Sequence, residues 1–230
     1  MKILLSTAFL ALLAAPLAQA QPASEYPPAW PRSGSTTLIE NDRGAAYNVT
    51  YYKDRPSPLH QHRYPFVGLD LDTAAIQVIE PDGTAHVFPV IKNGMWFLPK
   101  GTPHQEMSIT DPPRHIVAID IKEKTIPEAK NTTDLPANGY ASYQRKVLDN
   151  DRVTLWDCAW APGVKGVASF NSRDMFLAFA EGGDFSIGTG QEPAKVQHYE
   201  AGQAIFLPGG QVRAFSALQG TVHVMLVEIK

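Results

Sequence analysis

The sequence repeats itself once, and this repeat limits the chain to folds that can be built twice. Three short segments recur at a spacing of 109 residues, or 108 after a one-residue deletion near the end. They are Asn41–Arg43 with Asn150–Arg152, Leu98–Gly101 with Leu207–Gly210, and His115–Lys122 with His223–Lys230. Self-similarity at one long period indicates a duplicated structural unit. We therefore expect two copies of one domain.

The segments within the first copy have the composition of β-strands. Five of them are rich in β-branched or aromatic residues: Ala45–Tyr52, Ala74–Ile79, Ala85–Ile91, Met95–Leu98 and His115–Ile121. Pro81–Gly83 predicts a tight turn, because aspartate and glycine tolerate the positive φ that such turns require. Helical periodicity is absent. The sequence predicts an all-β fold of two barrels.

The first twenty residues predict a secretory signal peptide. Lys2 precedes the apolar run Ile3–Leu17, and Ala18–Ala20 has the small-residue pattern of a cleavage site. The run is too short for a typical membrane span. We expect cleavage after Ala20, a periplasmic or secreted protein, and no membrane association once the signal is removed. The single cysteine, Cys158, excludes an intramolecular disulfide.

Composition divides the remaining chain into four parts. Residues 21–34 form a proline-rich arm, 35–122 a first barrel, 123–146 a polar connector and 147–230 a second barrel. Proline removes backbone donors and favours extended structure, so the arm is not expected to be a barrel strand. We expect a loosely ordered arm. The alternative is that Tyr26 and Trp30 pack on the body or on the second subunit of a homodimer.

Charge excludes one class of partner. The formal net charge is −3, and it becomes −4 once Lys2 leaves with the signal. The sequence contains no basic patch, so nucleic acid is not an expected partner. We expect a small-molecule substrate or ligand instead.

Three histidines of the first copy have the spacing of a metal site. In a strand, residues i and i+2 face the same side, so His60 and His62 present two imidazoles together. His104 follows the turn Pro99–Gly101, where a returning strand could bring it alongside them. Imidazole nitrogens suit iron, zinc, copper, nickel and manganese. We expect one divalent metal cation bound by these three residues.

These motifs resemble the two signatures of the cupin superfamily. The first is His60-x-His62, and the second runs from Gly94 through Pro99–Gly101 to His104. The resemblance implies duplicated double-stranded β-helix (jelly-roll) barrels, a bicupin. Phe66 stands where the family usually has a glutamate, and the glycine-to-proline spacing is one residue short. The resemblance therefore implies a three-histidine site, as in thiol, diketone and aromatic-ring dioxygenases of the family.

The sequence constrains the fourth metal ligand and the pocket walls less than it constrains the three histidines. Strand alternation lets Glu106 face inward beside His104, either as a ligand or, as we favour, as a solvated rim carboxylate or hydrogen-bond acceptor to a ligand. Tyr64, Phe66 and Trp96 are the expected apolar wall of a substrate pocket. Three neutral ligands leave coordination positions open, which is typical of a catalytic metal.

The second copy has lost the three imidazoles. The repeat register places Ser169, Asn171 and Arg213 at the positions of His60, His62 and His104, and these side chains make a poor divalent-metal site. We expect this barrel to be metal-free.

In the second copy, arginines occupy register positions from which their side chains could fill the space of a metal. Arg173 occupies the register position of Tyr64, so it could join Arg213 in a carboxylate or phosphate site. The alternative is that Asp174 or Glu181 pairs with these arginines internally.

Three functions are compatible with these features. The first is a metal-dependent oxygenase acting on a small organic molecule. The second uses the metal as a Lewis acid for isomerase, lyase or hydrolytic chemistry. The third is a non-catalytic protein that binds a ligand or sequesters metal. A fold alone does not decide among them.

Overall fold

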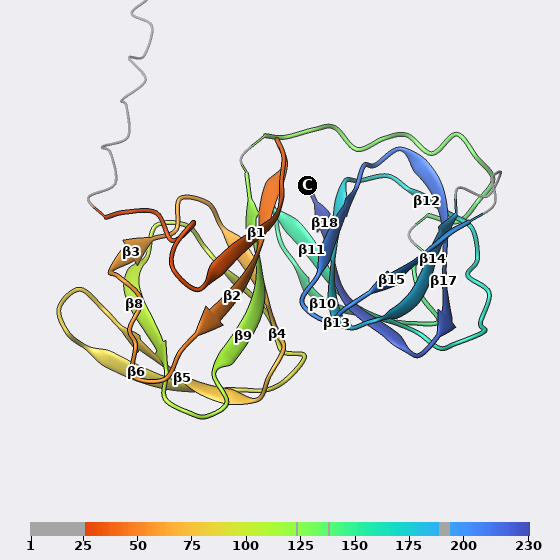
Figure 1. Cartoon of the computed structure of the whole chain (residues 1–230). Helices are drawn as coiled ribbons and strands as arrows, with labels where there is room; N and C mark the ends of the chain where they lie inside the picture. The colour runs from red at the N-terminus through yellow and green to blue at the C-terminus, as the bar shows by residue number, and fades with distance from the viewer. Residues whose placement is uncertain (1–25, 123, 138, 189–193) are drawn as a thin grey trace, which may run out of the picture.

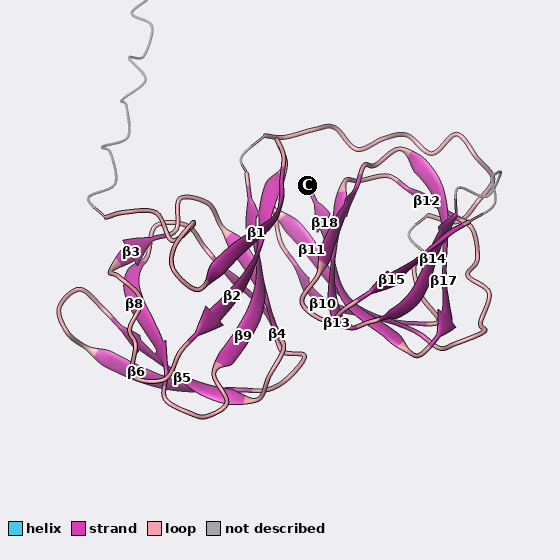
Figure 2. Ribbon diagram, in the orientation of Figure 1, coloured by secondary structure: helices cyan, strands magenta, loops and turns pink. Residues whose placement is uncertain are grey.

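The computed structural model describes residues 26–122, 124–137, 139–188 and 194–230. The proposed signal peptide lies outside these residues. Two β-barrels stand side by side, and Figure 2 shows strands and loops with no helix in this part of the chain. No helix of the described ranges is long and apolar enough to span a membrane. The all-β, two-barrel prediction is confirmed.

Each barrel is built from nine strands in the same order. The first contains β1 (Ser35–Glu40), β2 (Gly44–Tyr51), β3 (His60–Gln61), β4 (Phe66–Asp70), β5 (Ala74–Ile79), β6 (Ala85–Val90), β7 (Met95–Leu98), β8 (Pro103–Ser108) and β9 (Arg114–Ile121). The second contains β10 (Tyr143–Asp149), β11 (Val153–Trp160), β12 (Ser169–Asn171), β13 (Met175–Glu181), β14 (Gly183–Gly188), β15 (Lys195–Tyr199), β16 (Ala204–Leu207), β17 (Gln211–Gln219) and β18 (Val222–Ile229).

The two barrels also share one strand pairing scheme. Sheets β1-β2-β9-β4-β7 and β3-β8-β5-β6 form the first, and sheets β10-β11-β18-β13-β16 and β12-β17-β14-β15 form the second. All of these pairs are antiparallel. Adding nine to each strand number of a first-barrel sheet gives the strand order of the corresponding second-barrel sheet.

The two five-stranded sheets pack against each other through their outer faces. Val67 and Ile119 of the first barrel share one buried core with Leu155, Phe176 and other residues of the second. The central strands of these sheets (β4, β9, β13 and β18) are therefore covered on both faces, which explains why they are almost continuously apolar instead of alternating. The packing makes the two barrels one body.

The repeated Asn41–Arg43 segment forms a turn that also ties the barrels together. Asn41 Oδ1 accepts hydrogen bonds from the backbone N–H groups of Arg43 and Gly44, a local geometry that favours asparagine in turns. Arg43 then extends to the second barrel, where Nε lies 2.8 Å from Asp174 Oδ2. Its Nη1 donates to the backbone carbonyl of Lys124.

The N-terminal arm is part of the first barrel. Ala29 and Trp30 are buried, and Gln61 N donates to the carbonyl of Pro27. The connector makes the matching contact in the second barrel, where Phe170 N donates to Pro136 O. From Tyr26 on, the expectation of a loosely ordered arm is therefore wrong. The structure instead has the arm packed on the body of the barrel, with Trp30 stacked on Tyr47.

We predict that Arg43→Met lowers the free energy of unfolding by about 3 kcal/mol, because it leaves Asp174 without its partner at a largely buried site. Lys53→Met removes an exposed ion pair with Asp111 and should change stability little. Urea unfolding followed by fluorescence measures both. Equal effects in the two variants would contradict a stabilising role for the contact between the barrels.

Candidate metal centre

Two short strands bring three histidines together at one end of the first barrel. His60 on β3 lies directly opposite His104 on β8, and His62 follows two residues after His60. The ring centroids are 4.6 Å apart for His60 and His104, 5.2 Å for His60 and His62, and 5.3 Å for His62 and His104. One nitrogen from each ring lies within 4.8 Å of the others. All three side chains are buried.

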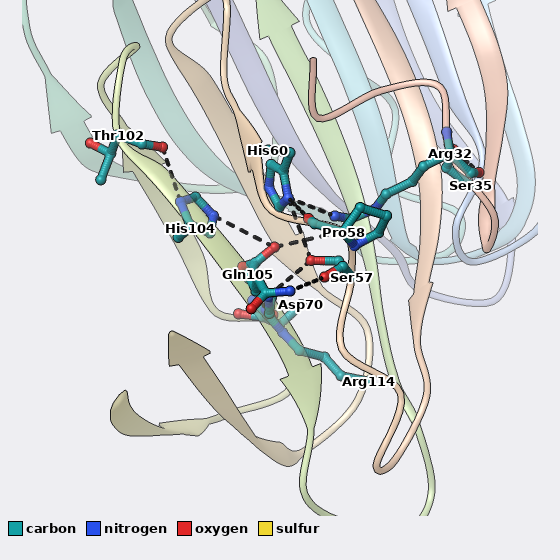
Figure 3. A network of polar contacts seen from close by, with 11 residues as sticks. Arg32, Ser35, Ser57, Pro58, His60, Asp70, Thr102, His104, Gln105 and Arg114 are labelled. Atoms are coloured by element: carbon teal, nitrogen blue, oxygen red, sulfur yellow. Dashed lines mark hydrogen bonds and ion pairs between the residues drawn. The ribbon is translucent and has the colours of Figure 1, made fainter. Parts of the chain in front are cut away.

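The surroundings of the rings prepare their nitrogens for a metal. His60 Nδ1 lies 2.8 Å from the carbonyl of Pro58, and His104 Nδ1 lies 3.1 Å from that of Thr102 (Figure 3). Donation to these carbonyls leaves Nε2 of each ring with a free lone pair. His60 Nε2 and both ring nitrogens of His62 are buried without a hydrogen-bond partner among the described residues. The donor set therefore fits a divalent metal.

Burial also keeps two of these rings neutral. It lowers the pKa of His60 to about 4 and that of His62 to about 3, although the nearby charge of Glu106 acts in the opposite direction. A neutral imidazole is the form that binds a metal. At neutral pH, no proton has to leave either ring before the metal binds.

Glu106 is a buried carboxylate beside the cluster. Its Oε2 lies 3.8 Å from His104 Nε2 and 3.7 Å from Arg32 Nη2, and Oε1 lies 4.0 Å from Arg114 Nη1. Burial opposes its charge, but the contact with His104 and the two guanidinium groups hold the pKa of Glu106 well below its ordinary value. Of the two roles expected for Glu106, the solvated rim position is wrong because the residue is buried, while the role of hydrogen-bond acceptor to a ligand stays a prediction. The carboxylate borders the site and balances charge there.

A second ion pair extends this polar network into the barrel. Arg114 Nε donates to Asp70 Oδ1 at 2.8 Å, and Trp96 Nε1 donates to Asp70 Oδ2 at 2.9 Å. Arg114 and Asp70 are both buried. The paired charges and the indole donor satisfy each other, which is what permits charged groups to lie inside a barrel.

A cavity of about 360 Å³ opens beside His104 and Glu106. Phe66 and Trp96 line it, as expected of pocket walls, and so do apolar residues of β5 and β6. Phe66 stacks on the His62 ring with centroids 4.0 Å apart, so it covers one side of the cluster. Tyr64 lies elsewhere, in a hollow beneath the arm. His62 follows the end of β3, so strand alternation does not extend to Tyr64.

Arg32 of the arm is a site residue that sequence reasoning missed. Its guanidinium contacts Glu106, lies 3.3 Å from His60 Nδ1, and packs over the rings of Trp30 and Tyr51. One signal could have revealed the arm, because Pro27 and Ser33 recur as Pro136 and Ser142 at the repeat spacing.

The second barrel repeats the geometry with other side chains. Ser169 on β12 lies opposite Arg213 on β17, as His60 lies opposite His104, and Asn171 follows two residues later. No histidine stands at these positions.

The structure does not bring the two second-barrel arginines into one anion site. Arg173 Nη2 lies 2.6 Å from Glu128 Oε2 of the connector, whereas buried Arg213 donates to Pro208 O and Gln211 Oε1. The expected internal partners are not used, since Asp174 pairs with Arg43 instead. Glu181 is exposed.

We predict that the metal-free protein loses stability as the pH falls from about 6.5 towards 4. The unfolded chain takes up protons on His60 and His62 near pH 6.5, while the folded chain cannot until their lowered pKa values are reached. For His60 the loss approaches roughly 3 kcal/mol at about 1.4 kcal/mol per pH unit. Urea unfolding of chelator-treated protein should show a flatter pH profile after His60→Gln with His62→Gln. Parallel profiles would contradict the neutral rings.

No protein-family model and no curated protein matches the sequence. Solved structures do. AerE from Microcystis aeruginosa superimposes with a TM-score of 0.61 at 11% identity, covering 90% of this chain and 100% of that chain. A cupin 2 conserved barrel domain protein from Leptotrichia buccalis gives a TM-score of 0.53 at 10% identity, covering 85% and 88%.

Oxalate decarboxylase from Bacillus subtilis is a third similar structure. One of its structures, whose subject is the Mn(II) centres of that enzyme, superimposes with a TM-score of 0.56 at 10% identity, covering 85% of this chain and 75% of that chain. Likeness at such low identity shows the fold. Together with the duplicated strand order and the three-histidine cluster, it establishes that this chain has the two-barrel cupin fold.

Proposed function

We propose that this protein is an exported metal-dependent enzyme of dioxygenase type, which acts on a small organic molecule at His60, His62 and His104. One observation carries the proposal: three buried imidazoles converge, with unpartnered nitrogens, beside a cavity of about 360 Å³. A structural metal is normally enclosed by four protein ligands, whereas a catalytic metal keeps a position open. The adjoining cavity supplies room for a substrate at that position.

The side chains around the cluster favour a substrate that approaches as an anion. Arg32 and Arg114 carry two positive charges, and Glu106 and Asp70 carry two negative charges that balance them. When bound, a divalent metal would supply a Lewis acid and, if redox-active, an electron-transfer centre. Its charge is not offset by three neutral imidazoles, so an anionic oxygen or sulfur of the substrate would offset it. The apolar cavity walls suit a ring or short chain.

The donor set leaves the metal open among iron, zinc, copper, manganese and nickel. Imidazole binds all of them, and intrinsic affinity favours copper and zinc. Export would expose the folding chain to the metals of the periplasm, while the resemblance to dioxygenases favours iron. The Mn(II) centres named for oxalate decarboxylase add manganese to the comparison.

The alternative is a lyase or isomerase without redox change. Glu106 favours it, because a buried carboxylate beside a Lewis acid could serve such chemistry without dioxygen. The similarity to oxalate decarboxylase supports the same alternative.

Metal analysis provides the first test. We expect about one divalent metal per chain, and His60→Ala with His104→Ala should abolish it while the circular dichroism of the β-barrels is retained. His198→Ala is the matched control, because this exposed histidine pairs with Asp184 and Glu200 away from the cluster. A full metal complement in the double variant would contradict the site. Two metals per chain would contradict a metal-free second barrel.

Oxygen uptake provides the second test. We expect the metal-loaded protein to consume dioxygen with at least one member of a panel of phenols, diketones and thiols, and the His60→Ala, His104→Ala protein to consume none. The matched variant Glu106→Gln keeps the size of the side chain and should lower the rate at least tenfold, since it removes a buried charge beside His104. Turnover of a carboxylic acid without dioxygen uptake would favour the lyase alternative.

A further inference from the structure

The cavity beside the histidines opens between two strands of the first barrel that do not pair with each other. β6 is the last strand of one sheet and β7 is the last strand of the other, and in the described chain they pair only with β5 and β4. Phe88, Pro89 and Val90 of β6 and Trp96 and Leu98 of β7 line the cavity. We call the gap between these residues the β6–β7 slot. Phe88 is 50% exposed, so the slot reaches the surface.

Charged groups are concentrated at the buried end of this cavity. The buried ionisable residues that line it are Asp70, His104, Glu106 and Arg114. His104 and Glu106 stand on β8, which β5 separates from β6, and Arg114 pairs with Asp70. The other charged lining residue, Glu80, is exposed and its Oε1 lies 3.4 Å from His86 Nε2. The cavity is therefore polar where it meets the metal ligands.

Apolar side chains line the cavity between this polar end and the slot. Ile76 and Val78 of β5 line it, and Ile76 lies directly opposite Phe88 in the β5–β6 pair. On the other side of the slot, the Trp96 ring packs edge-on against Phe66 with centroids 5.1 Å apart. A half-exposed aromatic ring at a cavity mouth presents apolar surface that a ligand can remove from water. These walls suit the apolar part of a molecule whose polar part lies deeper.

The second barrel has a similar gap with a different lining. A cavity of about 270 Å³ is lined by residues of β15 and β16, which end the two sheets of that barrel. Gln197 lines it at the repeat position of Phe88. The interior of this barrel is packed with buried aromatic residues, including Phe179 and Phe215, where the first barrel has carboxylates. The gap is thus common to both copies, whereas the apolar mouth that leads to charged groups belongs to the first.

We propose that the substrate of the metal centre is amphipathic. Its polar head binds the metal beside His104 and Glu106, and its apolar tail leaves the barrel through the β6–β7 slot against Phe88. The inference rests on the proposed function, because the metal holds the head, and it makes Phe88 a specificity-determining residue. An apolar tail gains by leaving water in the slot, whereas a charged tail loses its hydration there without a partner.

Titration of straight-chain hydroxamic acids into cobalt-loaded protein tests the proposal. The probes acetohydroxamic, butyrohydroxamic, hexanohydroxamic and octanohydroxamic acid share one metal-binding head and differ in the tail, and cobalt absorption reports binding of the head. We expect affinity to rise by about threefold for each methylene from the acetyl to the hexanoyl probe, because each methylene is buried against apolar walls.

The outcomes separate this inference from the proposed function. Equal affinities along the series would overturn the amphipathic substrate while leaving an open metal site in place. A cobalt spectrum that responds to none of the probes would overturn the open metal site, and the inference with it.

Variants of β6 locate the tail. Phe88→Gln introduces the residue that the second barrel has at this position, and it should weaken hexanohydroxamic acid by at least about fivefold while leaving acetohydroxamic acid unchanged. Phe88→Leu keeps an apolar wall and should retain most of the chain-length effect.

Val87→Gln is the matched control, because Val87 is 57% exposed on the same strand and does not line the cavity. It should change neither affinity, and metal content should equal that of the wild type in all three variants. Equal losses in Phe88→Gln and Val87→Gln, or a full chain-length effect in Phe88→Gln, would overturn the placement of the tail in the slot.

Discussion

The packing of the two five-stranded sheets against each other is the contact on which the rest of the molecule depends. Ala46, Val67 and Ile119 face Leu155, Phe176 and Val227 in one continuous core, so neither barrel exposes this face to water. The central strands of both sheets are buried on two sides, so a polar residue on their outer faces needs a partner across the contact, as Asn48 has in the carbonyl of Gly202. The side chains that vary between the two copies are mainly those inside the barrels.

The same frame holds a polar interior in one barrel and an apolar interior in the other. Glu106 and Asp70 correspond by the repeat spacing to Phe215 and Phe179. Phe179 and Phe215 are fully buried in the second barrel and pack with other aromatic side chains. A packed aromatic interior stabilises by burying apolar area, whereas buried charges stabilise little unless every one is paired. The second barrel therefore contributes stability, and the first has the groups for chemistry.

The repeat and the strand-like composition of the sequence were sufficient to predict the features that depend on local spacing. The repeat and the β-rich segments predicted two barrels, and the expected strands Ala74–Ile79 and Met95–Leu98 coincide with β5 and β7. Short β3 has no such signature, because two residues are too few to show alternation. The three histidines could be placed together because they occupy two turn-bounded motifs.

Contacts between distant segments could not be predicted in the same way. Arg32 reaches Glu106 only because the arm crosses the barrel end, and proline-rich composition alone suggested an unattached segment. Arg173 was placed in the second barrel by register, but the connector residue Glu128 pairs with it there. In both cases the deciding partner lies in a segment without strand character, whose path depends on tertiary packing.

The arm and the connector close the two barrels at the same place. Gln61 N donates to Pro27 O of the arm, and Phe170 N donates to Pro136 O of the connector. In the first barrel this closure also brings a charge to the site, because Arg32 of the arm contacts Glu106. A substitution that loosens the arm would therefore change the charge balance beside the histidines as well as the stability of the barrel end.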